Sequence, residues 1–270
     1  RLPSMADAVT AIDGVLSVRG GRRWWQTPAA LAGAIVIVAV GWLTWSWQAA
    51  EPTASMSSLP VVRLGVPVPA SDSLLPSQQQ VAAISPDGST IVYRAVRDGR
   101  PQLFARSLTT LQSEPIPGTD NAAAPFFSPD GRWIAFDGDG ALRKVAVAGG
   151  SPVTICEAPG GANASWAADT IVFTTTSGRV LQTVPSAGGV PAALTSLSRA
   201  RGDVSHEHPF LLPDGRLALF TVTTRERQHV AAVRLDTGEV HLLTEGAQPR
   251  YVQGGYLVFV RGGTLWAAPF

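Results

Sequence analysis

The sequence is poor in cysteine, lysine and charge. Its one cysteine, Cys156, excludes a framework of intrachain disulfides and any metal site built from several cysteines. Lys144 is the one lysine, and charged residues make up only 15% of the chain. Because the formal net charge is +1, no broad basic field indicates binding to nucleic acid.

Glycine and proline, by contrast, are abundant. The 270 residues include 27 glycines and 21 prolines, which is typical of a turn-rich β protein rather than a helical bundle. Apolar residues make up 45% of the chain, and this excludes disorder throughout. Composition therefore favours a β fold with many tight turns.

A long uncharged segment lies between Arg23 and Glu51. Residues 28–47 within it are mostly apolar, and as a helix they would measure about 30 Å, the thickness of a bilayer core. Indole rings, which prefer the membrane interface, flank both ends of the segment: Trp24, Trp25, Trp42, Trp45 and Trp47. We expect a transmembrane helix over residues 24–47. A buried core helix and a signal peptide are the alternatives, but no small-residue cleavage site follows the segment.

The charges around this segment predict its orientation. Arg19, Arg22 and Arg23 precede it, whereas residues 48–60 after it carry no positive charge. The positive-inside rule therefore places the N-terminus in the cytoplasm and the C-terminal part outside, in a single-pass protein of the inner or plasma membrane. Ala29 and Gly33 are four residues apart, a spacing of small residues that favours a homodimer through close helix contact.

The remaining chain divides by composition. Residues 1–23 read as the end of a cytoplasmic domain and a juxtamembrane segment, with a short amphipathic helix at their start. Residues 48–80 contain five prolines and form an extended Pro/Ser-rich linker. Residues 81–270 repeat one pattern and stop within its fifth copy. Because the chain opens without Met and ends directly after a strand-like run, we expect it to be a fragment.

The repeated pattern is a short strand, a tight turn and a β-rich strand that ends in an aromatic residue. Its copies read VAAISPDGSTIVY, APFFSPDGRWIAF, ASWAADTIVF, HPFLLPDGRLALF and PRYVQGGYLVF. They end at aromatic residues 37 to 47 positions apart: Tyr93, Phe136, Phe173, Phe220 and Phe259. A period near forty with about four strands per unit is typical of a β-propeller blade. The fold class we predict is all-β, a propeller of about five visible four-stranded blades, incomplete at its end.

The carboxylates in this pattern have a structural explanation. In a Pro-Asp-Gly turn, proline presets φ, aspartate bonds back to nearby amides, and glycine accepts a positive φ. Because the aspartates recur at one turn of successive units, we predict turn residues rather than catalytic or metal-binding groups. Three copies contain the turn: Pro86, Asp87 and Gly88; Pro129, Asp130 and Gly131; Pro213, Asp214 and Gly215.

Several stretches also carry a family resemblance. They read GTDNAAAPFFSPDGRWIAF, LRKVAVAGGSPVTIC, DVSHEHPFLLPDG and PRYVQGGYLVFVRGGTLWAAPF. Here the chain resembles the extracytoplasmic half of bacterial transmembrane serine/threonine kinases, in which a TolB-like, WD-repeat-like propeller follows a cytoplasmic kinase domain and one span. The opening RLPSM resembles the end of such a kinase domain. The resemblance implies a membrane anchor and sensor that binds a protein or small-molecule ligand.

No catalytic residue emerges from the chain itself. It has no glycine-rich nucleotide loop, His-Arg-Asp or Asp-Phe-Gly, so a kinase activity would belong to a parent protein. No G-x-S-x-G elbow supports a hydrolase of the kind that combines a propeller with a catalytic domain. A TolB-like periplasmic scaffold without kinase coupling is the alternative function. We expect neither a cofactor nor a metal.

One cluster of ligand-type side chains remains. His206 and His208 flank Glu207, and on an extended strand the two imidazoles would point the same way. A metal would need a third ligand from another blade, so we assign these residues to ligand binding, with a packed loop as the alternative. Arg250, ahead of the fifth repeat, either lines the channel with them or forms a structural salt bridge.

Overall fold

The structure is a computed structural model that describes residues 73–74, 80–110, 112–160, 162–252 and 254–270. The N-terminal helix, the transmembrane helix at 24–47 and most of the linker that we predict lie outside these residues. Within the described ranges, no helix is both long and apolar enough to cross a bilayer.

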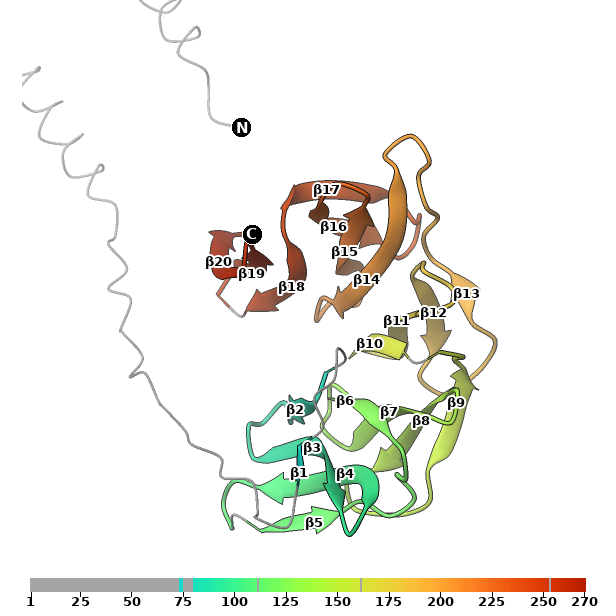
Figure 1. The fold of residues 1–270 in the computed structure, drawn as a ribbon, viewed down its shortest axis with the longest axis vertical. Helices are drawn as coiled ribbons and strands as arrows, with labels where there is room; N and C mark the ends of the chain where they lie inside the picture. The colour runs from blue at the N-terminus through green and yellow to red at the C-terminus, as the bar shows by residue number, and fades with distance from the viewer. Residues whose placement is uncertain (1–72, 75–79, 111, 161, 253) are drawn as a thin grey trace, which may run out of the picture. The chain divides into compact units, whose positions relative to one another are not determined.

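The described chain folds into five antiparallel sheets that follow one another around a common centre (Figure 1). The first sheet consists of β1 (Ser73–Leu74), β2 (Ala82–Ile84), β3 (Thr90–Arg97), β4 (Arg100–Ser107) and β5 (Ser113–Pro115). In it, β1 and β2 both pair with the same edge of β3, so residues 73–74 of the predicted linker belong to the sheet. The second sheet consists of β6 (Ala123–Phe127), β7 (Trp133–Gly138), β8 (Ala141–Ala146) and β9 (Val153–Glu157).

The third and fourth sheets repeat the four-strand plan, and the fifth has three strands. The third has β10 (Ala162–Ala167), β11 (Thr170–Thr175), β12 (Gln182–Pro185) and β13 (Ala192–Ala193). The fourth has β14 (Asp203–Leu211), β15 (Leu217–Thr224), β16 (Gln228–Arg234) and β17 (Val240–Glu245). The fifth has β18 (Ala247–Val252), β19 (Tyr256–Arg261) and β20 (Thr264–Pro269). Each sheet is one blade, with its first full strand nearest the centre, so the predicted propeller of four-stranded blades is confirmed for this part of the chain.

The Pro-Asp-Gly turns join the first and second strands of their blades. In the second blade the Ser128 hydroxyl donates to Asp130 (2.6 Å), which also accepts the backbone N–H of Arg132 (3.0 Å). Gly131 closes the turn by donating to the carbonyl of Ser128 (2.9 Å), at a φ of 69°. The same bonds at Asp87 lower its pKa to about 2, the Ser85 hydroxyl contributing most. These carboxylates are therefore engaged with their own turns.

The aromatic residues that end the second to fifth repeats form the cores between neighbouring blades. Phe173 is fully buried among residues of the second and third blades, including Leu142 and Ile155. Phe136 and Phe220 take the equivalent places one blade earlier and one blade later. Burying a side chain of this size contributes about 1.5–3 kcal/mol, so the blades are held mainly by these layers. The period seen in the sequence is thus the period of inter-blade packing.

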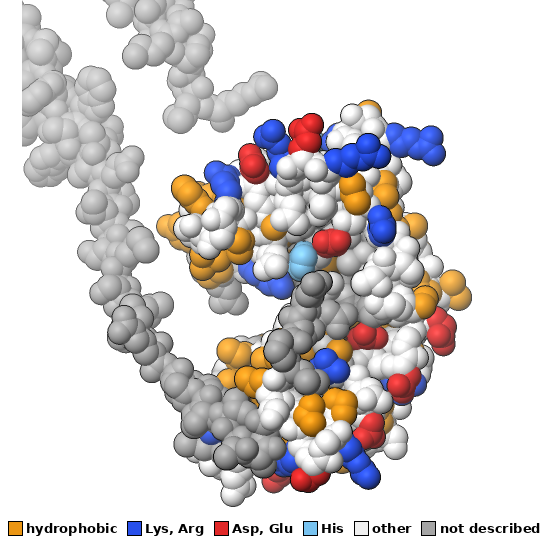
Figure 2. All heavy atoms as spheres, viewed as in Figure 1, with side chains coloured by type: hydrophobic (Ala, Val, Ile, Leu, Met, Phe, Trp, Pro, Cys, Tyr) orange, Lys and Arg blue, Asp and Glu red, His pale blue; other side chains and the backbone are white. Residues whose placement is uncertain are grey.

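The fifth blade exposes several large apolar side chains. They retain 40 to 70% of their accessible surface: Val252, Tyr256, Leu265, Trp266 and Phe270. Figure 2 shows hydrophobic side chains gathered over the same blade. Among the described residues, the extensive contacts between strands join consecutive blades and do not join the fifth blade to the first.

Candidate functional site

A bulge before a proline shapes the inner strand of three blades. In β6, β14 and β18 the pairing register gains one residue at the step that contains Ala124, His208 and Gln248. Each of these residues has a positive φ, of 49°, 52° and 53°, although none is glycine. Non-glycine residues adopt this conformation at a cost, and such strain gathers at functional sites. The bulge turns one side chain per blade out of the strand's alternation.

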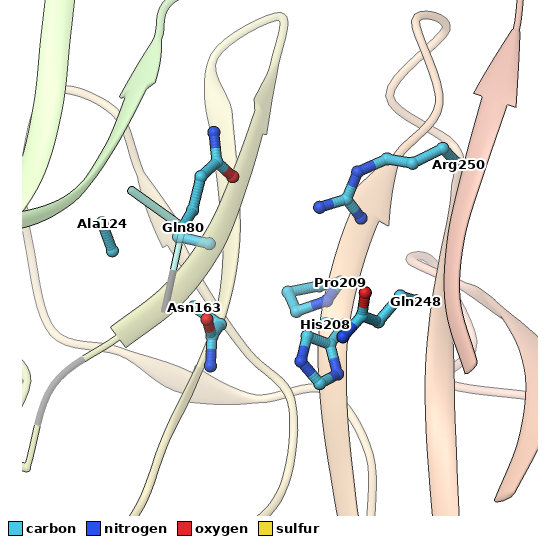
Figure 3. A pocket seen from close by; sticks show the side chains of 8 residues that line it. Gln80, Ala124, Asn163, His208, Pro209, Gln248 and Arg250 are labelled. Atoms are coloured by element: carbon cyan, nitrogen blue, oxygen red, sulfur yellow. The ribbon is translucent and has the colours of Figure 1, made fainter. Parts of the chain in front are cut away.

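These residues line a cavity of about 360 Å³ at the centre of the blades. Figure 3 shows the side chains converging on one space from separate strands: Asn163 from β10, His208 from β14, Gln248 and Arg250 from β18. The third blade carries Ala164 where the others have proline, and β10 pairs without a register shift. The same position of the inner strand therefore contributes to the cavity wall in each of these blades, whether or not the strand has the bulge.

Arg250 supplies the positive charge of this cavity. Its Nη1 donates to the carbonyl of Pro249 (2.9 Å), and its guanidinium lies 5.5 Å from the centre of the Phe210 ring. Within the described residues, no carboxylate oxygen lies within salt-bridge distance of it. Desolvation by the surrounding protein lowers its pKa, although the side chain is open to the cavity. Arg250 thus lines the channel, and the structural salt bridge considered from the sequence is not formed there.

His208 adds a second polar group to the wall. Its Nδ1 is buried without a hydrogen-bond partner in the described residues, so Nε2 is the nitrogen that solvent can reach. Burial lowers the pKa of His208, which keeps the imidazole neutral near pH 7. A buried unpaired acceptor is tolerated better than a buried unpaired N–H, so the proton belongs on Nε2. His208 then offers a donor to the cavity.

Side-chain amides complete the polar wall. Gln80 is held by two hydrogen bonds from its Nε2, to the carbonyls of Ala82 (3.0 Å) and Pro125 (3.2 Å). The amides of Asn163 and Gln248 have no hydrogen bond to the other described residues, and both face the cavity (Figure 3). The cavity therefore holds two amides that are free to bind a ligand.

An apolar hollow adjoins the polar cavity. Its volume is about 270 Å³, and it shares Gln80, Ala164, Pro209 and Arg250 with the cavity above. Aromatic side chains from three consecutive blades line it: Phe126, Phe127, Trp166 and Phe210. Arg250 therefore lies where a polar chamber meets an apolar one.

His206 does not join His208 in this cavity. Its side chain is fully buried in the fourth blade, where the ring packs edge-on against Phe220 at 5.0 Å. Nδ1 lies 2.8 Å from the Thr195 hydroxyl, and Nε2 lies 3.3 Å from Asp203. The expectation that the two imidazoles point the same way fails because the positive φ of His208 breaks the alternation of β14.

The buried network of Thr195, His206 and Asp203 has the hydroxyl–imidazole–carboxylate order of a catalytic relay, but a substrate cannot reach it. Because the Asp203 carboxylate can only accept, Nε2 of the neutral ring carries the proton and Nδ1 accepts the Thr195 hydroxyl, whose oxygen also accepts the backbone N–H of Leu181 (3.0 Å). Thr195 is 8% exposed and His206 is 0% exposed, which leaves no path for a substrate. Burial raises the pKa of Asp203, but hydrogen bonds from Arg201, Ser198 and His206 outweigh it and hold the pKa below its ordinary value. The network fastens the crossover between the third and fourth blades.

Glu207 lies in a second cleft, between the third and fourth blades. The Ser205 hydroxyl donates to its carboxylate (2.7 Å), and Arg179 and Thr174 line the same cleft of about 390 Å³. His206, Glu207 and His208, which we assign to ligand binding from the sequence, therefore lie in three different environments. No group of three or more His, Cys, Asp and Glu side chains in the described ranges could hold a metal ion.

Sequence reasoning missed the amides and the aromatic hollow. Asn163 and Gln248 carry no motif of their own, yet each stands one residue before the start of a repeat copy, as His208 stands before Pro209. Reading that position across the blades would have found the cavity wall. The turn aspartates do not line the central cavity or the hollow beside it.

Comparison with known proteins identifies the fold. TolB from Acinetobacter baumannii is similar to the chain with a TM-score of 0.58 and 22% identity, over 73% of this chain and 53% of that one. A putative TolB from Agrobacterium tumefaciens gives 0.55 and 21%, over 66% and 68%. The propeller domain of Cps50 (Swd1) from Myceliophteria thermophila gives 0.52 and 15%, over 68% and 64%. The chain thus spans about half the length of the first TolB.

No family model matches the chain, and no curated protein matches it. At these identities the solved structures show the fold alone. The described residues form a TolB-like β-propeller.

Proposed function

We propose that the propeller is a non-catalytic binding module, and that the whole chain is the membrane anchor and extracytoplasmic sensor of a receptor-type serine/threonine kinase. The observation that carries the binding role is the central cavity. Four inner-strand side chains from three blades converge there, and the amides of Asn163 and Gln248 and Nδ1 of His208 lack hydrogen-bond partners among the described residues. Concave sites with a few convergent polar groups are where proteins take their ligands.

The kinase coupling rests on the sequence resemblance, which spans the stub at residues 1–23, the apolar segment at 24–47 and the propeller. A single span transmits a signal by a change in self-association, because an isolated helix has no second packed state to switch into. Ala29 and Gly33 offer the close helix contact that such a dimer needs. Ligand binding at the propeller would shift this equilibrium only to the extent that it favours one oligomeric state.

The first test is the reading frame ahead of Arg1. A kinase catalytic domain encoded in frame supports the receptor function, whereas a start codon directly before Arg1 contradicts it. The second test compares the complete protein with a form that lacks residues 81–270. We expect the two to differ in autophosphorylation and in oligomeric state. Equal activity and equal oligomeric state would reject the sensor function.

A second candidate function is a TolB-like scaffold that binds partner proteins without kinase coupling. The exposed apolar side chains of the fifth blade, which include Leu265 and Trp266, favour it, since large exposed apolar groups gathered on a surface mark interaction sites. Both functions place the propeller outside the cytoplasm, and reporter fusions test this location. An alkaline phosphatase joined after Phe270 is expected to be active, and activity of a cytoplasmic reporter there instead would reverse the topology and reject both functions.

A further inference from the structure

The charge of the central cavity is unbalanced. Its lining residues include one cation, Arg250, and no carboxylate. Glu207, next to His208 in the chain, acts on that imidazole by its charge, but its carboxylate accepts the Ser205 hydroxyl and lines the other cleft. Arg250 is exposed to the cavity and has no carboxylate within salt-bridge distance among the described residues, so its guanidinium is available to pair with a bound anion.

The number and type of donors limit the charge of that anion. Arg250 contributes one full positive charge, while His208 is neutral and the amides of Asn163 and Gln248 carry none. A monoanion matches this wall, whereas a phosphate dianion would remain half uncompensated. The planar fork of arginine pairs with the two oxygens of a carboxylate in a bidentate manner. Neutral N–H groups from the imidazole and the amides can bind the same oxygens from the side.

The apolar hollow indicates what kind of group can be attached to the bound anion. Arg250 lines both the polar cavity and the hollow, and its guanidinium lies over Phe210 at 5.5 Å. Phe126 and Trp166 line the same hollow as Arg250. A ligand whose carboxylate is bound by Arg250 can therefore place an aromatic or aliphatic group among these rings.

We infer that the channel of this propeller binds a carboxylate attached to an apolar group, with Arg250 as the anchor, His208, Asn163 and Gln248 as polar contacts, and the aromatic hollow as the apolar contact. Such a group occurs at the C-terminus of a peptide that ends in a hydrophobic residue, and in free aryl or alkyl carboxylic acids. The inference rests on the binding role proposed above for the cavity, and it does not depend on kinase coupling.

The test measures binding by calorimetry to the full chain held in a mild non-ionic detergent. The probes are N-acetylphenylalanine and its amide, and a peptide ending in phenylalanine, either free or amidated at its C-terminus. We expect at least one free acid to bind ten times or more tightly than its amide. A preference shown only by the peptide identifies a polypeptide end as the source, and one shown only by the small acid identifies a free carboxylic acid.

Variants locate the site. Arg250→Gln is expected to abolish the preference for the acid over the amide, and Arg250→Lys to retain part of it. Arg227→Gln is the matched control, because Arg227 pairs with glutamates at the surface and its change should alter neither affinity. If Arg250→Gln does not fold, Asn163→Leu on the third blade tests the same site, with an expected loss of threefold or more.

Equal binding of acid and amide, no binding of either pair, or an acid preference that survives Arg250→Gln would overturn the inference. None of these results bears on the kinase. An effect of the propeller on autophosphorylation with no acid binding would reject the ligand class alone. Acid binding with no effect on autophosphorylation would reject the sensor function and leave the ligand class standing.

Discussion

The Thr195 hydroxyl, in the segment that leaves the third blade, donates its proton to Nδ1 of His206 on the inner strand of the fourth blade, over 2.8 Å. This bond leaves Nε2 of the imidazole to donate to Asp203, so the tautomer of His206 is set by its neighbours. Every polar atom of the ring is thus paired inside the core. The crossover between the two blades is fixed by one neutral histidine.

Stability is expected to fall as the solution is acidified, because of this histidine. Burial lowers the pKa of His206 below its ordinary 6.5, despite the opposing effect of Asp203, while Arg201 adds to the lowering. Below pH 6.5 the unfolded chain therefore binds more protons than the folded one, and stability present above that pH is lost as the pH falls. Chemical unfolding measured between pH 7.5 and 5.5 should show this loss.

The variant His206→Gln should be less stable at pH 7.5 and should lose less on acidification. Part of the pH dependence should remain in it, because burial also lowers the pKa of His208. An equal loss in both proteins would exclude His206 as a source.

The turn aspartates should differ in their contribution to stability. Asp130 accepts the Ser128 hydroxyl and a backbone N–H. Within the described part of the chain Asp214 accepts only the N–H of Arg216, since Leu212 stands where the serine would be. Removing a typical hydrogen bond costs about 1 kcal/mol, and less for groups as open to solvent as these.

Asp130→Ala should therefore lower the free energy of unfolding by up to about 1 kcal/mol, and Asp214→Ala by less. Denaturant titration of both variants measures the difference. Neither change should alter binding of acid probes at the channel. Loss of binding at an unchanged unfolding midpoint would contradict a purely structural role for Asp130.

Truncating a side chain in the layer between the second and third blades should lower the free energy of unfolding far more than truncating an exposed one. Phe173 is fully buried there, so Phe173→Ala should cost about 3–5 kcal/mol from lost transfer free energy and the cavity left behind. Trp266 has a larger side chain but is 48% exposed, so Trp266→Ala serves as the comparison. We expect a smaller loss for it than for Phe173→Ala, because about half of the Trp266 side chain is already in solvent. Similar losses in both would show that the fifth blade is covered in solution.

Cys156 should report on unfolding. It is the one cysteine of the chain and is buried between blades, and this burial raises its pKa to about 11, with a smaller contribution from Glu157. At pH 8 roughly one thiol in a thousand is ionised, and the thiolate is the reactive form. A disulfide reagent should therefore leave the folded protein unmodified for hours and react at once in denaturant. Fast reaction of the folded chain would show that the second blade opens locally.

The blades could be predicted from the sequence because the residues that pack and turn them recur at a regular spacing. One aromatic residue in each unit after the first fills an inter-blade layer, so Phe136, Phe173 and Phe220 can be recognised in the sequence as a repeat. The turns follow for the same reason, since Asp130 and Gly131 act on atoms within five residues of them.

The site could not be predicted in the same way. The burial of His206 depends on Thr195, outside its own strand, and the orientation of His208 depends on a positive φ that no periodicity encodes. The local signal was present as the dipeptides Ala124-Pro125, His208-Pro209 and Gln248-Pro249. That these dipeptides mark a bulge becomes clear only from the pairing register of β6, β14 and β18 with the strands beside them.

The residue before each proline is different in each blade, whereas the backbone around it is nearly the same. Alanine, histidine and glutamine occupy this position at φ values within 4° of one another, and asparagine occupies it in the third blade. The core layers do not include these side chains. The positions that line the channel and the positions that pack the blades are therefore separate. Single substitutions can change the wall of the channel, blade by blade, without touching the layers that hold the blades together.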